Sequence, residues 1–208
     1  MSDGPAPAHT KVSRSDWVDA AAAALDEVPI DKLRVLTLAG DLSVSRSSFY
    51  WYFTDLAELH RELLVRWERN TVSIVDRTNR SSNSIIQACL GVFECWADKR
   101  LYDATLDLAV RDWGRRDSET AKRVAEADRQ RLDALTTMFS NHEFSADDAL
   151  VRARLVYHSQ VGYYAVGTDE PMVVRQAYLP YYLEAITGQT ASEEELIAFE
   201  QLLAAIPQ

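Results

Sequence analysis

Apolar residues recur along this chain with the period of an α-helix. Near the N-terminus, five of them share one helical face: Trp17, Ala21, Ala24, Leu25 and Val28. Ser13 followed by Asp16 has the form of a capping box, which places the start of this first helix. Pro29 ends it.

A second, short helix is predicted before a break at Ser43 and Val44. It begins either with a cap at Asp31 or as late as Arg34, and the pattern leaves both starts open. Its apolar face holds Val35, Leu38, Ala39 and Leu42.

Ser45 is a good N-cap for a third helix of about two turns. Thr54 then caps a long fourth helix that runs to about Val75. The same periodicity predicts later helices over 83–99, 101–115, 118–140, 146–167, 172–187 and 193–205, the last with a capping box of Ser192 and Glu195. No strand pattern accompanies them, so the sequence predicts an all-α fold.

The stretch from Leu38 to Phe53 has the layout of a helix-turn-helix. Phe49 and Phe53, four residues apart, bury one face of its second helix. The other positions of that helix carry hydroxyl groups, one arginine and aromatic rings, which suit the major groove of DNA: Arg46, Ser47, Ser48, Tyr50, Trp51 and Tyr52. A buried, aromatic-rich helical hairpin would show the same spacing.

Charge does not help the DNA interpretation. The net charge is −10, and residues 1–55 hold five basic and eight acidic side chains. Phosphates favour basic domains. The prediction therefore depends on the motif and its geometry.

The stretch LAGDLSVSRSSFYWYF, followed by TDLAELHRELL, resembles the hallmark of the TetR-type transcriptional regulators. The resemblance is specific over residues 13–67 and loose beyond them. It implies a three-helix DNA-binding domain with a helix-turn-helix over 13–55, after a disordered tail over 1–12. It also implies a larger helical domain over 56–208 for ligand binding and dimerisation.

Carried over position by position, the resemblance implies that eight residues contact DNA. Ser45 to Ser48 match the start of the recognition helix, the aromatic residues match positions that touch backbone phosphates, and Arg34 matches a phosphate contact. The full set is Arg34, Ser45, Arg46, Ser47, Ser48, Tyr50, Trp51 and Tyr52.

Two positions depart from the family pattern. Ser43 stands where the family usually has a glycine with a left-handed backbone. The family also often has a phosphate-binding lysine early in the fourth helix, where this chain has Thr54, Asp55 and Leu56. We expect the amides at that helix N-terminus to remain available to a phosphate, with Arg34, Lys32 and Lys11 as the basic contacts.

The helix over 146–167 is apolar nearly all round in its second half, which indicates burial on two sides. One side can face the body of the protomer and the other a partner subunit. With the helix over 172–187 it would form a four-helix dimer interface through Ala153, Val161, Tyr164, Leu179, Tyr182 and Leu183. A monomer with a thick core is the alternative.

Aromatic residues gather in the middle of the chain, and together they exceed what helix packing needs. They indicate a cavity for a small hydrophobic or aromatic ligand. We expect its lining to include Trp67, Phe93, Trp96, Tyr102, Trp113, Tyr157 and His158. Core packing is the alternative for each of them singly.

The sequence offers little support for an enzyme, a metal-binding protein or a membrane protein. The four histidines are scattered without metal-ligand spacing, and neither a phosphate-binding glycine loop nor a nucleophile elbow is present. We expect no enzyme, no catalytic or metal site and no cofactor. No run of residues is apolar enough to cross a bilayer, and Cys89 and Cys95 are placed too far round one helix to pair, so we expect a cytoplasmic protein.

The sequence therefore predicts a sequence-specific DNA-binding regulator, a repressor released by a small-molecule ligand. Its partners would be a palindromic double-stranded operator, a second copy of the chain and an unknown small hydrophobic or aromatic ligand. The alternative is a helical protein that binds other proteins or small molecules without an operator.

Overall fold

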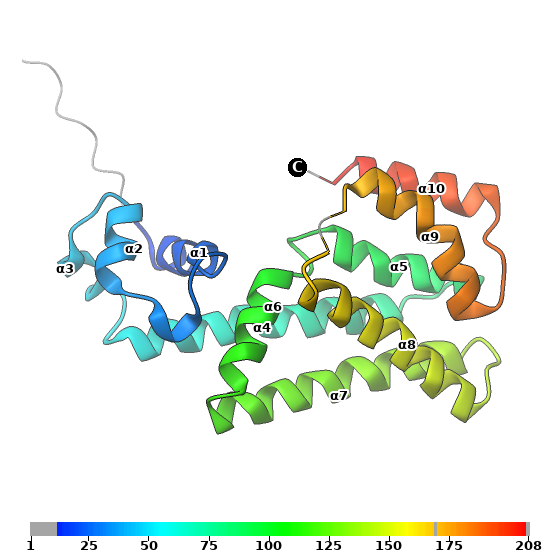
Figure 1. Cartoon of the computed structure of the whole chain (residues 1–208), viewed down its shortest axis with the longest axis horizontal. Helices are drawn as coiled ribbons and strands as arrows, with labels where there is room; N and C mark the ends of the chain where they lie inside the picture. The colour runs from blue at the N-terminus through cyan, green and yellow to red at the C-terminus, as the bar shows by residue number, and fades with distance from the viewer. Residues whose placement is uncertain (1–11, 169, 207–208) are drawn as a thin grey trace, which may run out of the picture. The chain divides into compact units, whose positions relative to one another are not determined.

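The computed structural model describes residues 12–168 and 170–206, and in this part of the chain helices are the regular secondary structure and no strand occurs (Figure 1). The predicted all-α class is confirmed. The chain divides into two compact units, one ending at Val65 and the other beginning at Arg66. We call them the N-terminal unit and the body. Apart from Val12, the tail predicted over 1–12 lies outside the described residues, as does Lys11.

The N-terminal unit contains α1 (Arg14–Ala24), the 3-10 turn η1 (Ile30–Lys32), α2 (Val35–Asp41), α3 (Arg46–Phe49) and the beginning of α4 (Leu56–Thr78). The capping box of Ser13 and Asp16 is present, but the first helix ends before the predicted Pro29, and Val28 is left largely exposed after it. Arg34, and not Asp31, is the N-cap of α2.

Three aromatic side chains form the centre of the N-terminal unit. Trp17 and Phe49 meet edge to face with their ring centroids 5.2 Å apart, and Phe49 stacks on Phe53 at 5.0 Å. All three are buried. Such contacts contribute about 0.5–1.5 kcal/mol each beyond the apolar area that they bury. They hold α3 against α1, as the predicted burial of Phe49 and Phe53 requires.

Arg14 ties α1 to the residues that follow α3. Its guanidinium lies 4.3 Å from the ring centroid of Phe53 and donates to the carbonyl of Tyr52. It also donates to the carboxylates of Glu58 and Glu62 at 2.8 and 2.7 Å. These bonds make the first turns of α4 part of the N-terminal unit, so the unit ends at Val65, beyond the domain boundary predicted at 55/56.

The body consists of the rest of α4 and of α5 (Ile85–Ala97), α6 (Ala104–Gly114), α7 (Ser118–Ser140), α8 (Ala146–Ala165), α9 (Met172–Thr187) and α10 (Glu193–Ala204). The observed bounds lie within a few residues of the predicted ranges, and the capping box of Ser192 and Glu195 is present. α7 packs along both α6 and α8, while α5 packs against α9 and α10 (Figure 1). Among the described residues, no helix is long and apolar enough to cross a membrane.

A buried ionic network joins four helices of the body. The carboxylate of Asp107 on α6 accepts from the indole N–H of Trp67 on α4 at 2.7 Å and from Arg131 on α7 at 3.0 Å. Its second oxygen accepts from Arg111 at 2.7 Å. The hydroxyl of Tyr157 on α8 accepts from both arginines, at 2.7 and 3.1 Å.

The centre of this network is charged although it is buried. The side chains of Arg131 and Asp107 are 0% and 3% exposed. Burial by itself would raise the pKa of Asp107, but the charges of Arg131 and Arg111 outweigh it and hold that pKa below its ordinary value. The carboxylate is therefore ionised at neutral pH, and each charge in the network compensates another.

Removing one charge from the ion pair of Asp107 and Arg131 should therefore destabilise the body strongly. We expect Asp107→Asn to lower the free energy of unfolding by about 3–5 kcal/mol, because it leaves the buried Arg131 without its carboxylate. Denaturant unfolding measures this change. Asp112→Asn on the same helix is the matched control, since its ion pair with Arg116 is about half exposed, and it should change stability by no more than about 0.5 kcal/mol.

The same variant gives a pH test. A carboxylate whose pKa is lowered by folding stabilises the fold above its unfolded pKa of about 3.9 and loses that effect as the pH falls. The stability difference between the wild type and Asp107→Asn should therefore be full near neutral pH and shrink below about pH 4. Equal stability of the two proteins at pH 7 would contradict the central role of the network.

Candidate functional site

The predicted recognition helix is short, and its inner face packs on the aromatic core of the N-terminal unit. We call Ser45–Phe53 the recognition segment: α3 occupies Arg46–Phe49, and turns complete it. The turn before it passes through Ser43 at φ 55°, the left-handed conformation predicted for this position. A non-glycine residue there costs about 1 kcal/mol. The amide of Val44 donates to the carbonyl of Ala39 at 2.9 Å, which closes the turn between α2 and α3.

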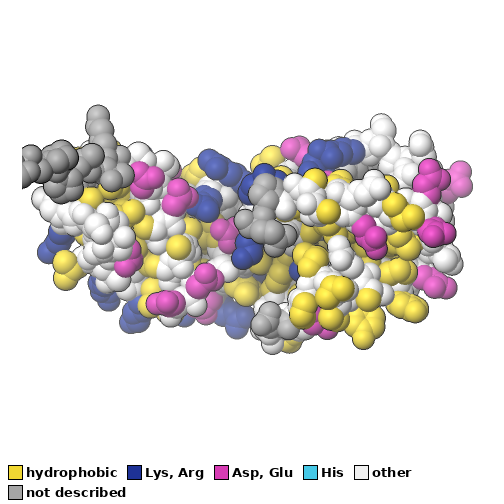
Figure 2. Space-filling model, turned by 90° about the horizontal axis from the view of Figure 1, so that it is seen from above, with side chains coloured by type: hydrophobic (Ala, Val, Ile, Leu, Met, Phe, Trp, Pro, Cys, Tyr) yellow, Lys and Arg dark blue, Asp and Glu magenta, His cyan; other side chains and the backbone are white. Residues whose placement is uncertain are grey.

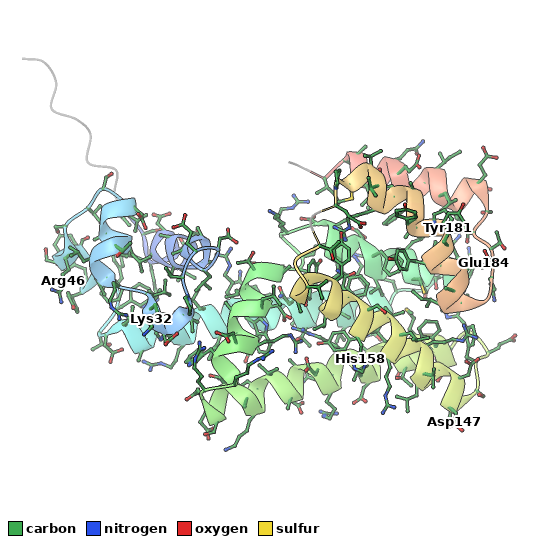
Figure 3. The ribbon with its side chains drawn as sticks, viewed as in Figure 1. Lys32, Arg46, Asp147, His158, Tyr181 and Glu184 are labelled. Atoms are coloured by element: carbon green, nitrogen blue, oxygen red, sulfur yellow. The ribbon has the colours of Figure 1, made fainter. Side chains whose placement is uncertain are left out.

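The outer face of the recognition segment has few partners of its own. Tyr50 is 51% exposed and Trp51 80%, while Arg46 and Ser47 are also exposed. Arg46 reaches the hydroxyl of Tyr50 at 3.4 Å and forms no ion pair with any described residue. Figure 3 shows Arg46 at the outer edge of the N-terminal unit.

The remaining predicted DNA contacts are partly engaged within the chain. The hydroxyl of Ser48 donates to the carbonyl of Ser45 at 2.7 Å, and that of Tyr52 donates to the carbonyl of Val12. Arg34 is exposed and donates to the carbonyl of Leu33 at 2.8 Å. These three side chains therefore have fixed positions, whereas Arg46, Tyr50 and Trp51 have their polar or aromatic groups open to solvent.

The start of α4 differs from the prediction. Asp55, and not Thr54, caps the helix, because its carboxylate accepts from the amide of Glu58 at 2.8 Å. The carboxylate of Glu58 in turn accepts from the amide and the hydroxyl of Thr54, at 2.7 and 2.6 Å. The bonds from Thr54 and then from Arg14 lower the pKa of Glu58 to about 2. The amides of Thr54 and Glu58 are therefore already bound to carboxylates and are not available to a phosphate.

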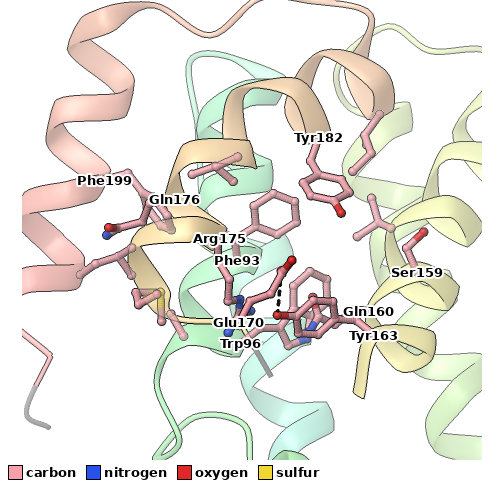
Figure 4. A pocket seen from close by; sticks show the side chains of 16 residues that line it. Phe93, Trp96, Ser159, Gln160, Tyr163, Glu170, Arg175, Gln176, Tyr182 and Phe199 are labelled. Carbon is pink, nitrogen blue, oxygen red and sulfur yellow. Dashed lines mark hydrogen bonds between the residues drawn. The ribbon is translucent and has the colours of Figure 1, made fainter. Parts of the chain in front are cut away.

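The body contains a cavity of about 150 Å³ between α5, α8, α9 and α10 (Figure 4). Most of its wall is apolar: Phe93, Trp96, Val156, Leu179, Ile186 and Phe199. Its polar part consists mainly of Ser159, Gln160, Tyr163, Glu170, Arg175 and Tyr182. Phe93 and Trp96 lie with their ring centroids 5.4 Å apart, so that two aromatic surfaces border the cavity.

Only two of the predicted pocket residues, Phe93 and Trp96, border this cavity. The structure places the others elsewhere. Trp67 and Tyr157 belong to the buried ionic network, and the ring of Tyr102 lies 5.6 Å from the guanidinium of Arg131. Neither of the two residues that complete the predicted set, Trp113 and His158, lines the cavity, and His158 is exposed on α8 (Figure 3).

The predicted dimer residues point mostly inward. Ala153 and Leu183 are fully buried inside the protomer, so in this conformation their side chains offer no surface to a second copy. Tyr164 donates to the carbonyl of Trp96 at 3.2 Å, and Val161 packs beside it on the core. Leu179 and Tyr182 border the cavity, but Tyr182 is also 55% exposed, so its place in a dimer interface stays a prediction.

Another set of exposed apolar residues on α8 and α9 is absent from the predicted interface: Val151, Leu155, Tyr178 and Tyr181. Figure 2 shows hydrophobic side chains gathering on the surface of the body. Their spacing by three or four residues on the face away from the inward stripe is the signal that could have identified them. Within the described residues, no group of histidine, cysteine, aspartate and glutamate side chains could hold a metal ion.

No family model and no curated protein matches the chain. Solved structures of TetR-family regulators do match it. AmtR of Mycobacterium smegmatis is 14% identical with a TM-score of 0.62, over 98% of this chain and 99% of that one. GusR of Salmonella enterica is 13% identical with a TM-score of 0.56, over 93% and 94%. At these identities the likeness concerns the fold, and it extends the resemblance seen in residues 13–67 to nearly the whole chain.

Proposed function

The chain has the fold of the TetR-type regulators, and we propose that it acts as one: a homodimeric transcriptional repressor that binds a palindromic operator and is released by a small ligand. The observation that carries this proposal is the exposed face of the recognition segment. An arginine without an ion pair and a tryptophan that is 80% exposed stand on a helix-turn-helix whose own core is complete. Such groups are suited to bases and phosphates of a major groove.

Dimerisation follows from the small size of the recognition segment. One such segment reaches too few bases for useful affinity, and two of them related by a two-fold axis read two half-sites. The exposed apolar residues of α8 and α9 supply a surface for the second copy, because a monomer seldom leaves such a patch in water.

Release by a ligand requires that the ligand bind the conformation without DNA more tightly. A coupling of about 1–3 kcal/mol would weaken operator binding roughly 5- to 150-fold. The cavity of the body is our candidate for this site. α4 begins in the N-terminal unit and ends in the body, so it is a continuous helix along which a displacement could be transmitted.

Arg46→Ala tests the DNA site. In gel shifts with DNA flanking the gene of this chain, it should weaken specific binding by about 1–3 kcal/mol and relax the preference at one base position, because Arg46 would read a guanine. Arg61→Ala is the matched control, since Arg61 is exposed in the same unit but lies on α4. Failure of the wild-type protein to bind this DNA or any sequence selected from a random pool would overturn the proposed function.

Thr54→Lys tests the electrostatics at the start of α4. Thr54 is exposed beside the carboxylates of Asp55 and Glu58, where the family often has a lysine. One added phosphate contact should raise DNA affinity and steepen the slope of log K against log salt by about 0.9. Thr54→Gln should leave the slope unchanged. A lysine variant with the slope of the wild type would show that this position does not face the DNA backbone.

Tyr181→Glu tests the dimer. Tyr181 is 70% exposed on α9, so a charge there should leave the protomer folded but disfavour burial against a second copy (Figure 3). Light scattering should show a shift from dimer to monomer, with loss of operator binding. Val72→Glu, at an exposed apolar position on α4, should leave both unchanged. A wild-type monomer at micromolar concentration would contradict the proposed assembly.

A further inference from the structure

The wall of the cavity contains a cation that lacks a carboxylate partner. Arg175 lies with its guanidinium 5.1 Å from the ring centroid of Tyr163 and forms no ion pair with any described residue. Burial raises the pKa of the neighbouring Tyr164 to about 12, and Arg175 opposes that rise. A partly buried guanidinium without a carboxylate partner favours an anion that can accept two parallel hydrogen bonds.

A second donor, Gln160, lies on the same wall. Its buried amide nitrogen approaches the hydroxyl of Tyr164 and lowers the pKa of that group, but it has no acceptor in normal hydrogen-bond geometry. Buried donors are nearly always paired in folded proteins, so this one is suited to an acceptor that a ligand brings. Figure 4 shows Gln160 and Arg175 among the side chains around the cavity, on α8 and α9.

The wall also carries one carboxylate, that of Glu170. It already accepts from the hydroxyl of Tyr163 at 3.2 Å, the contact drawn as a dashed line in Figure 4. Arg175 and Gln160 are both donors, and the one acceptor that both approach is the neutral hydroxyl of Tyr164. An acceptor with negative charge would complete them.

The size and the apolar wall define the rest of the ligand. A cavity of about 150 Å³ accommodates one six-membered ring. Phe93 and Trp96 offer ring faces and edges to it, and Leu179 and Phe199 extend the apolar surface.

We propose that this cavity binds a single-ring aromatic carboxylic acid, with its carboxylate on Arg175 and its ring against Phe93 and Trp96. The assignment rests on the proposed function only in taking this cavity as the ligand site of the regulator. The acid supplies the anion that Arg175 lacks, accepts from Gln160, and places its ring against the apolar side chains of the wall.

Calorimetric titration of the full-length protein without DNA tests this assignment. The probes are benzoate and phenylacetate, with benzamide as the neutral analogue of the same shape and phenylalanine as the analogue with an added ammonium group. Both acids should bind, and benzamide should bind at least about tenfold more weakly, since it offers no charge to Arg175. Equal binding of benzamide, tighter binding of phenylalanine, or no binding of either acid would overturn the proposal.

Arg175→Gln should weaken binding of the acids roughly 10- to 100-fold and leave benzamide unchanged. Arg154→Gln is the matched control, because Arg154 is exposed on α8 and does not border the cavity. Arg175→Lys keeps the charge without the planar fork and should retain part of the affinity, which gives a second test if the glutamine variant does not fold. Acid binding that is unaffected by both variants would overturn the assignment of Arg175.

Operator binding is then measured with and without the acid, which separates the two proposals. Acid binding that depends on Arg175 supports the inference even if operator affinity does not change, and in that case ligand release is what fails. Operator binding by a protein that takes neither acid supports the proposed function and overturns the inference.

Discussion

The buried carboxylate of Asp107 is the point on which the body of this protein depends. Trp67, Arg111 and Arg131 all donate to it, which ties α4, α6 and α7 to one another. Tyr157 adds α8 to the same network. Such an arrangement adds little net stability over an apolar core, but a shifted packing would leave charges buried without partners. The network therefore disfavours shifted packings of these helices.

α8 is shared between this rigid network and the cavity. Tyr157 points into the network, while Val156 and Gln160, on neighbouring positions of the same helix, border the cavity. The network fixes one side of α8, and α9 and α10, which take no part in the network, close the cavity on the other side. The part of the cavity wall formed by α9 and α10 is therefore not tied to the buried charges.

The N-terminal unit uses its charges differently. Arg14 pairs with Glu58 and Glu62 and so joins α1 to α4. The exposed basic residues that remain for a phosphate backbone include Arg46 and Lys32 (Figure 3). If the chain binds DNA as proposed, specific contacts from the recognition segment carry a larger share of the affinity than in a basic domain, because the bulk attraction of a positive surface is missing.

The sequence alone determined the helices, the capping boxes of the first and last helices, and the burial of Phe49 and Phe53, because these follow from interactions between residues three or four positions apart. The tertiary structure decided which apolar and aromatic residues face the core, the cavity or the solvent. Trp67 and Tyr157 joined a network whose other members come from distant helices, and Ala153 and Leu183 turned inward. The cavity likewise forms only where four helices meet, so the sequence alone could not place Arg175 on its wall. The period of the apolar residues shows which face of a helix is buried. It does not show whether that face packs on the core, on a cavity or on a second copy.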